Sequence, residues 1–310
     1  MGAVHEVLPE VEHRMCAQHI LSAWRKKWKG DERKNKFWEC AYSTFEGQFK
    51  DKLQEMDKLG DGIVEDLLCY PHHTWCRAYI GIVSKCDAVE NNMSETFNGW
   101  ILDARFKSII TMLEEIRKKV MERIAVMRQF ANTWNSEIAP TVQSKLDKNK
   151  YIAASYNILF NGEHGFEVLE GLYQHTVDLN KHTCTCREWD LKGIPCPHAI
   201  CAMFNRNLNP ESFVSYWFKK ETFLKCYGTV MQPVMGMRLW PETDYPIIEP
   251  PEIRKKAGRP KTKRRRDKDE PSKSKSGKLS KKGVKITCSL CKSEGHNKQG
   301  CPNRGRPQVS

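Results

Sequence analysis

Apolar residues along the chain follow two different periods, and each period predicts a different element. Between residues 100 and 136 they recur at steps of three and four, which places them on one face of an α-helix. The recurring residues are Phe106, Ile109, Ile110, Leu113, Ile116, Val120, Ile124 and Met127. We therefore expect a long amphipathic helix that turns this face toward a core, and we assign it to the segment 101–150.

Between residues 151 and 180 the period shortens to two. Bulky side chains alternate with polar ones, as they do in a strand with one buried face. The bulky positions are Tyr173, His175, Val177 and Leu179. Two glycine-containing pairs, Asn161-Gly162 and Glu170-Gly171, are typical of tight turns. A small antiparallel meander is therefore expected here, as part of a module that covers residues 151–230.

The remaining segments complete the prediction of an α+β fold. Residues 1–100 combine short helical patterns with many aromatic residues, so we expect a mainly helical N-terminal body. Residues 231–251 are rich in proline and are expected to wrap that body without regular structure. Residues 252–287 are rich in Lys, Arg and Ser and have too little apolar surface to fold, so we expect a disordered basic linker there.

The composition narrows the class of protein. The chain has 310 residues, 39% of them hydrophobic, and no apolar run reaches the ~18 residues that a membrane span needs. The first residues lack the basic and apolar regions of a secretory signal. The 13 cysteines are therefore expected to be reduced, and metal ligation is favoured over disulfides. We expect no membrane partner.

The formal net charge of +13 is concentrated near the C-terminus. Residues 252–287, hereafter the basic segment, contain 16 Lys and Arg against 4 Asp and Glu, whereas residues 1–251 carry a net charge of −2. A polycationic segment beside a near-neutral body is the electrostatic signature of nucleic-acid binding. The candidate contacts are Arg259, Lys261, Lys263, Arg264, Arg265 and Arg266. The alternative is a solvated linker that only improves solubility.

Two short patterns refine the prediction for the basic segment. The run from Lys261 to Arg266 resembles a nuclear localisation signal. Gly258-Arg259-Pro260 resembles the centre of an AT-hook, which places arginine in the narrow minor groove of A·T-rich DNA. We therefore expect nucleic acid, and DNA in particular, as the partner, and the nucleus as the location.

A first cysteine and histidine cluster lies directly after the predicted meander. Cys184 and Cys186 are separated by one residue, and so are Cys196 and His198. Three thiolates and one imidazole fill a tetrahedral structural Zn²⁺ site, whereas a catalytic zinc keeps one position open for water. The alternative is a group of buried cysteines near a surface histidine. Cys201 and Cys226 are interpreted as core or spare thiols.

A second cluster has the spacing of a CCHC zinc knuckle. Its residues are Cys288, Cys291, His296 and Cys301, and Gly295 supplies a permissive backbone before the histidine. A segment as short as 288–301 cannot bury a core, so zinc would provide its folding energy. The loops carry no aromatic ring for base stacking, which leaves phosphate contacts through Lys292, Lys298 and Arg304, or a protein partner, as alternatives.

The order of the motifs resembles that of a known family. The first cluster, with Trp189 and the run Gly193–Ala199, resembles the SWIM zinc finger. An H-R-x-C-x2-H segment at His13–His19 and an N-N-x-S-E-x-F-N segment at Asn91–Asn98 precede it, and the Gly-Arg-Pro segment and the knuckle follow. All five features resemble, in order, the C-terminal half of plant Mutator-like (MuDR-type) transposases.

The resemblance implies an RNase H-like ancestry for residues 1–100. In that family three acidic residues hold two divalent metal ions for strand transfer, and Glu95 matches the third acid. The first two belong upstream of the H-R-x-C segment, and no aspartate of this chain matches them. Because one carboxylate cannot hold two metal ions, we expect Glu95 to be vestigial and the chain not to be an enzyme.

The sequence thus predicts a zinc-binding, nucleic-acid-binding protein derived from a Mutator-like transposase, with Zn²⁺ at two structural sites. Two alternatives stay open. The chain is a truncated fragment of an active transposase, or it acts with a partner that supplies the missing acids, in metal-dependent DNA strand transfer. Or it is a zinc-dependent interaction module that binds other proteins through the SWIM finger or the knuckle.

Overall fold

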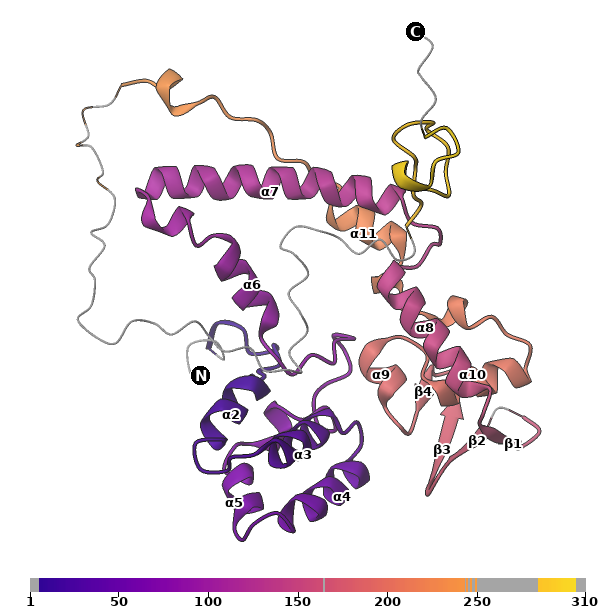
Figure 1. Ribbon diagram of the computed structural model, residues 1–310. Helices are drawn as coiled ribbons and strands as arrows, with labels where there is room; N and C mark the ends of the chain where they lie inside the picture. The colour runs from indigo at the N-terminus through magenta and orange to yellow at the C-terminus, as the bar shows by residue number, and fades with distance from the viewer. Residues whose placement is uncertain are drawn as a thin grey trace. The chain divides into compact units, whose positions relative to one another are not determined.

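The computed structural model describes residues 6–163, 165–242, 244, 246, 249 and 284–304. Over these residues, ten α-helices and one four-stranded antiparallel sheet form an α+β fold, as predicted (Figure 1). The described residues divide into two compact units. The first combines the residues before Thr96 with Val142–Phe218, and the second combines Thr96–Thr141 with the residues from Lys219 onward. None of the described helices is both long and apolar enough to cross a membrane.

Four short helices form the N-terminal part of the first unit. They are α2 (Ala17–Trp24), α3 (Asp31–Tyr42), α4 (Glu46–Asp57) and α5 (Ile63–Leu68), followed by a 3-10 turn at His72–Thr74. Their apolar faces meet around Phe37 and Trp75, whose rings stack with centroids 5.5 Å apart. Leu21, Met56 and Ile63 are fully buried in the same core. Residues 6–100 contain no strand among those described, so the RNase H-like ancestry stays a prediction from the resemblance.

The long amphipathic helix is shorter than the expected span 100–136. After α6 (Asn92–Trp100), a 3-10 turn covers Ala104–Phe106 and α7 begins only at Ile109, ending at Asn132. Lys107 is extended, with φ −102° and ψ 167°, which ends the turn before α7. The segment 101–150 therefore contains two helices, because α8 (Pro140–Ala153) begins separately at a proline.

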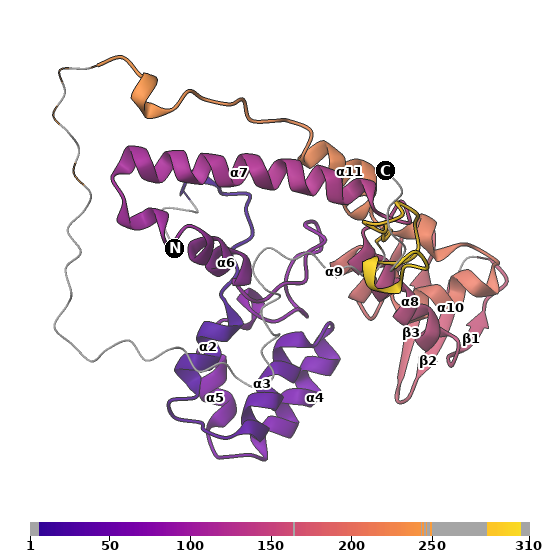
Figure 2. The same ribbon diagram turned by 45° about the horizontal axis from the view of Figure 1, so that its top comes forward.

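The apolar face of α7 is only partly covered. Met127 and Ala131 are its buried residues, whereas Ile109, Ile110 and Leu113 are between 40% and 57% exposed. The expectation of a core-facing helix is therefore wrong for its first half. Packing is concentrated at its C-terminal end, where α11 (Lys220–Cys226) lies alongside in both views and Phe223 contacts Trp134, just beyond α7 (Figures 1 and 2).

The meander is present as predicted. It comprises β1 (Asn157–Phe160), β2 (Gly165–Glu170), β3 (Tyr173–Asp178) and β4 (Thr183–Cys184), in the order β1-β2-β3-β4. Neighbouring strands are antiparallel, with Phe166 opposite Val177 and Val168 opposite His175. These four side chains are buried, and they alternate with more exposed positions because successive residues of a strand face opposite sides.

Two helices complete the module around the sheet. A short α9 (Glu188–Lys192) follows β4, and α10 (Pro197–Asn205) packs against all four strands. Two 3-10 turns, Pro210–Phe213 and Tyr216–Phe218, end the first unit. In the second unit a 3-10 turn at Met237–Leu239 is the sole regular element described in 231–242, and Arg117 donates to the carbonyl of Gln232. A last turn lies at Lys298–Gly300.

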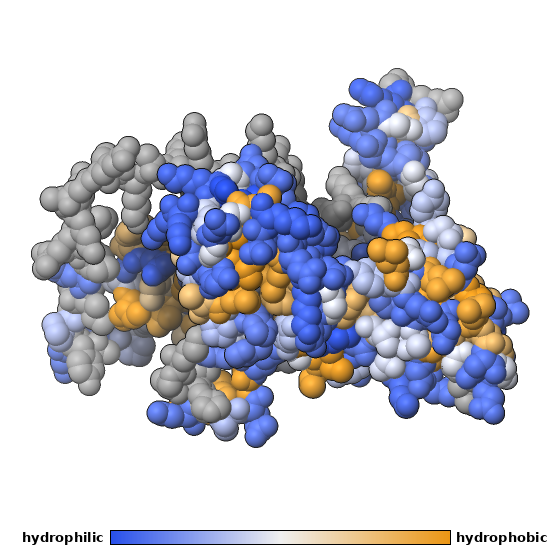
Figure 3. All heavy atoms as spheres, turned by 90° about the horizontal axis from the view of Figure 1, so that it is seen from below, coloured by the Kyte–Doolittle hydropathy of each residue, from blue (hydrophilic) through white to orange (hydrophobic). Residues whose placement is uncertain are grey.

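Exposed apolar side chains occur in both units. On the face shown in Figure 3 they form separate patches in a mainly hydrophilic surface. The exposed apolar residues of the described part of the chain include Phe97, Leu113, Leu159, Leu172 and Trp217. The predicted disorder of the basic segment concerns residues that lie outside the described ones, apart from 284–287.

Candidate metal centres

The first cluster brings its four predicted ligands into one buried site. Cys184 ends β4, Cys186 follows it, Cys196 is the N-cap of α10 and His198 lies in the first turn of that helix. The side chains are at most 5% exposed, and all four ligand atoms lie within 4.8 Å of one another. Cys184 Sγ and His198 Nδ1 are 3.8 Å apart. Two such ligands on a tetrahedral Zn²⁺ would be roughly 3.6 Å apart, so the residues fit this ion.

The local sequence explains how the ligands are presented. The N–H of Arg187 donates to the carbonyl of Cys184 (2.7 Å), which closes a tight turn after β4. Pro197 occupies the first helical position, where its missing N–H costs nothing. The amides of Glu188 and Ala199 point at the sulfur atoms of Cys186 and Cys196, at 3.4 Å each. These N–H groups favour thiolates, which are the forms that bind a metal.

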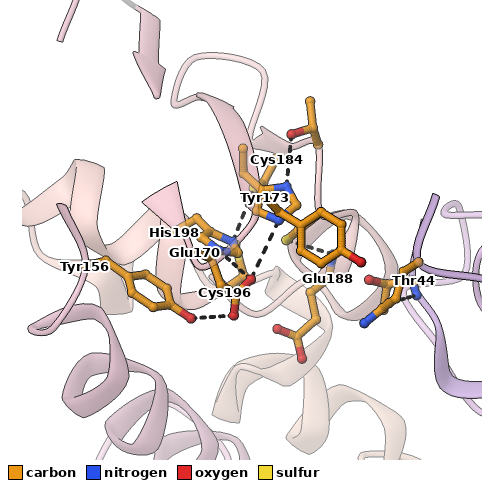
Figure 4. Close-up of polar contacts among 12 residues, drawn as sticks. Thr44, Tyr156, Glu170, Tyr173, Cys184, Glu188, Cys196 and His198 are labelled. Atoms are coloured by element: carbon orange, nitrogen blue, oxygen red, sulfur yellow. Dashed lines mark hydrogen bonds and ion pairs between the residues drawn. The ribbon is translucent and has the colours of Figure 1, made fainter. Parts of the chain in front are cut away.

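The orientation of His198 is fixed by residues that the motif does not contain. Its Nδ1 faces Cys184, whereas its Nε2 lies 3.1 Å from Oε2 of Glu170 (Figure 4). The hydroxyl of Tyr156 donates to the other carboxylate oxygen at 2.7 Å. The Tyr156 ring also stacks on the imidazole, with centroids 5.1 Å apart and planes 12° apart. Zinc-bound histidines commonly donate their second N–H to a carboxylate in this way.

A second imidazole lies beside His198. The ring centroids of His175 and His198 are 4.3 Å apart, and Nδ1 of His175 is 3.3 Å from the hydroxyl of Thr185. Nε2 of His175 is buried, has no hydrogen-bond partner and lies 3.6 Å from Glu170. Glu170, His175 and His198 thus form a further group of potential ligands within 4.8 Å.

Comparison with known families identifies the module. The model of the SWIM zinc finger matches residues 175–207, which include all four ligands of the first cluster. The chain contains a SWIM zinc finger. This domain is typical of Mutator-like transposases and related proteins. The search of curated proteins and the search of solved structures returned no match to the chain.

The pKa shifts in the SWIM finger indicate that its cysteine ligands carry protons until a metal binds. Burial raises the pKa of Cys196 well above its usual value, and a hydrogen bond with Cys186 raises the pKa of Cys184. Burial also lowers the pKa of His198, and neighbouring His175 lowers it further. Without metal the thiols are therefore protonated and the imidazole is neutral. Zinc binding has to release the thiol protons.

Two residues outside the ligand set form hydrogen bonds with the backbone at or next to the cysteine ligands. Oδ2 of Asp190 accepts from the amide of Cys184 (3.1 Å), and Asn149 on α8 donates to the carbonyl of Pro195 (2.8 Å). Gly193 has φ +65°, and a Cβ there would lie 2.7 Å from Cβ of Ser215, so the loop before Cys196 needs glycine at this position.

Arg187 connects the SWIM finger to the N-terminal helices of the same unit. Its guanidinium donates to the carbonyl of Ala78 and, at 2.9 Å, to that of Ile80. It also lies 3.3 Å from the carbonyls of Thr44 and Arg77. Because Arg187 directly follows the ligand Cys186, the position of this anchor depends on the same turn that presents the metal ligands.

The four candidate ligands of the second cluster also lie close together. The ligand atoms of Cys288, Cys291, His296 and Cys301 lie within 4.8 Å of one another, and Cys291 Sγ is 3.2 Å from His296 Nε2. Cys288 and Cys301 are buried, whereas Cys291 and His296 are half-buried. Hydrogen bonding by the backbone of Ser293 lowers the pKa of Cys291 to about 6. The donor set fits Zn²⁺ as well as the first one does.

Backbone geometry explains the spacing of the second cluster. The amide of Lys292 donates to the carbonyl of Cys288 (2.9 Å), which closes the turn between the first two cysteines. Gly295, directly before His296, has φ +94°, a backbone conformation that glycine adopts without steric cost. Thr287 pairs with Glu294 across the turn, and Val284 pairs with Trp134 after α7.

The two N-terminal motifs lie side by side. The amide of Ala17 donates to the carbonyl of Val89 (2.8 Å), and the amide of Asn91 points at Sγ of Cys16 (3.4 Å). Glu95, in the first turn of α6, has a carboxylate oxygen 3.9 Å from Nε2 of His19. The three groups of potential metal ligands found among the described residues do not include Glu95.

The remaining predicted site residues fall into two classes. Arg259, Lys261, Lys263, Arg264, Arg265 and Arg266 lie outside the described residues. Cys201 is buried with its thiol directed at the carbonyl of Tyr156, and Cys226 is exposed, so neither belongs to a cluster. The sequence interpretation missed Tyr156, Glu170, His175 and Asp190. Alternation along β3 placed His175 on a buried face, but no spacing pattern links Glu170 to a histidine 28 residues later.

Proposed function

We propose that the chain is a nuclear, zinc-stabilised protein that binds nucleic acid and derives from a Mutator-like transposase. The observation that carries the proposal is the SWIM finger, in which four buried ligands surround one point. Four protein ligands complete a tetrahedral site and leave no position for water. The zinc is therefore structural, and its task is to hold β4, the turn at Arg187 and the start of α10 together.

We assign a second structural zinc to Cys288, Cys291, His296 and Cys301, as a CCHC knuckle. The convergence of the four ligand atoms and the positive φ of Gly295 support this assignment. Residues 284–304 contain two buried cysteines but hardly any apolar core of their own. A short segment of this kind depends on metal binding for its fold.

The basic segment is the proposed contact with nucleic acid. Its net charge of +12 comes from the sequence alone, and such a charge drives salt-dependent binding to phosphates. The Gly258-Arg259-Pro260 core favours A·T-rich DNA over other nucleic acids. The SWIM finger, whose domain type is found in Mutator-like transposases, supports the proposed ancestry.

Catalysis of strand transfer is not part of the proposal. The resemblance assigns one acidic residue of residues 1–310 to the catalytic set, Glu95, which lies beside His19. A two-metal site needs several converging carboxylates. A metal-dependent nuclease assay with Glu95→Gln as control tests the alternative of an active fragment, since activity lost in this variant would overturn the proposal.

Binding to DNA is tested by a salt titration of the full chain. We expect replacement of Arg264, Arg265 and Arg266 by Gln to weaken binding and to reduce the slope of log K against log salt by about 0.9 per lost phosphate contact. The matched control replaces Lys26, Lys29 and Lys148, three exposed lysines of the first unit, by Gln. Fluorescence anisotropy with A·T-rich and G·C-rich duplexes provides the measurement.

One outcome of that titration supports a second function. The loops of the second cluster carry no aromatic ring, which favours a protein partner over stacked bases. If the unsubstituted chain fails to bind duplex DNA at near-physiological salt, the function is that of a zinc-dependent protein-interaction module instead.

A further inference from the structure

We propose that Glu170 is a positioning residue for the zinc of the SWIM finger, accepting a hydrogen bond from the Nε2–H of His198 so that the lone pair of Nδ1 faces the thiolates. The proposal rests on the zinc site assigned above. Glu170 lies at the end of β2, outside the residues 175–207 that the SWIM model matches. The carboxylate therefore comes from the β-meander, outside the residues that the SWIM model matches.

The geometry supports one defined tautomer of His198. Nδ1 is 3.8 Å from Cys184 Sγ, and Nε2 is 3.1 Å from Glu170 Oε2. A neutral imidazole has one N–H and one lone pair, so a hydrogen bond donated from Nε2 leaves the lone pair on Nδ1 for the metal. Without an acceptor at Glu170, nothing on this side of the ring distinguishes the two nitrogens.

Tyr156 holds Glu170 and His198 at the same time. Its hydroxyl donates to Oε1 of Glu170, which leaves Oε2 directed at the imidazole (Figure 4). Its ring stacks on His198 with planes only 12° apart, which restricts rotation of the imidazole. The ligand is therefore oriented from three elements, because Tyr156 follows α8, Glu170 ends β2 and His198 lies on α10.

The position of His175 points to an alternative role for Glu170, as a ligand of a second metal ion. Its Nε2 is buried without a hydrogen-bond partner and lies 3.6 Å from Oε2 of Glu170. A second divalent ion held by Glu170, His175 and His198 would satisfy this nitrogen. It would also require His198 to lose its only remaining ring proton and to bridge two metals as an imidazolate. A carboxylate acceptor needs no such step, so the positioning role is the one that the geometry favours.

Zinc affinity measured on the full chain distinguishes these roles. Substitution of Cys288 and Cys291 by Ser provides a parent in which the SWIM finger is the remaining assigned site. In this parent we expect Glu170→Ala to lower zinc affinity about 10- to 100-fold, as measured by competition with a chromogenic chelator. Glu170→Gln should recover part of the loss, because its amide oxygen still accepts a hydrogen bond.

The absorption spectrum of Co²⁺ bound in place of zinc provides a measurement that would not change if Glu170 only stabilised the fold. Co²⁺ bound in place of zinc should show a shifted d–d absorption band in Glu170→Ala, because the imidazole ligand is no longer fixed in orientation. The matched control is Glu167→Gln on the same strand, whose side chain is exposed and bonded to Gln174. The control should leave both the affinity and the cobalt spectrum unchanged, and far-UV circular dichroism at saturating zinc verifies folding.

Three results would contradict the positioning role. The first is a folded Glu170→Ala variant with zinc affinity within twofold of the parent and an unchanged cobalt spectrum. The second is a parent that holds two zinc ions per chain and loses one of them in Glu170→Ala, which would establish the second ion. The third is a parent that binds no zinc, which would remove the proposed function as well, whereas the first two leave it intact.

Discussion

Zinc and protons compete for the sulfur atoms of the SWIM finger. Burial raises the pKa of Cys196, and the hydrogen bond with Cys186 raises that of Cys184, so the metal-free thiols stay protonated at neutral pH. The pKa of His198 is lowered, so the imidazole holds no additional proton to release. The cysteine side chains of the finger therefore become negatively charged only when they lose their protons to bind the metal.

This competition predicts that zinc affinity falls as pH falls. Binding releases up to three protons, one from each cysteine of the site, so added protons favour the metal-free form. We expect a steep decrease in affinity between about pH 8 and 6. Chelator competition across this range measures it in the Cys288→Ser, Cys291→Ser background, and the heat of binding in buffers of different ionisation enthalpy counts the protons. An affinity independent of pH would contradict the assigned thiolate ligands.

Arg187 shows how one residue joins two elements of the first unit. It belongs to the turn that presents Cys186, and its guanidinium donates to carbonyls of the loop after α5. Arginine suits this position because its planar group carries five donors in a fixed fork, whereas lysine carries a single ammonium.

Removal of this side chain should loosen the contact between the finger and the helices. We expect Arg187→Ala to lower the free energy of unfolding of the zinc-loaded protein by about 1–3 kcal/mol, because partly buried carbonyls lose their donors. Arg187→Lys should recover little of this loss. Chemical denaturation measures it, with Arg128→Ala, an exposed residue of α7, as the control. Equal stability of Arg187→Ala and the control would show that the contact is not energetically important.

The elements themselves differ in how completely they are covered. The strands β2 and β3 bury one face against α10, and the N-terminal helices close around Phe37 and Trp75. The first half of α7, by contrast, leaves Ile109 and Leu113 exposed. An apolar stripe in a sequence identifies the face of a helix that favours burial, but it does not supply the element that buries it.

At the scale of the whole molecule, the ligands of the SWIM finger and those of the second cysteine and histidine cluster differ in their exposure to solvent. Every ligand of the SWIM finger is at most 5% exposed, whereas Cys291 and His296 of the second cluster are half-buried. The second cluster is also enclosed by a short segment with little core, so its ligands can leave the metal by local opening.

We therefore predict that zinc leaves the two sites at different rates. Excess chromogenic chelator should remove zinc in two phases, with the second cluster in the fast phase and the SWIM finger in the slow phase. Substitution of Cys288 and Cys291 by Ser should abolish the fast phase alone. A single rate for the unsubstituted chain, or loss of the slow phase in this variant, would contradict the prediction.

The sequence by itself determined the two ligand sets, the meander and the α+β class. Ligand spacing is local, because Cys184 and Cys186 share one turn and Cys196 and His198 share one helix start. The alternation around His175 and the glycine turns are local as well. Such features depend on backbone geometry within a few residues, which a sequence records directly.

Tertiary structure alone decided what surrounds those ligands. Glu170 and Tyr156 meet His198 because a hairpin and the end of α8 pack against α10, and Arg187 meets Ala78 across 109 residues of chain. The exposure of Ile109 also depends on what packs against the helix. Contacts between distant segments follow from how surfaces fit together, and no period or spacing along the chain encodes that fit.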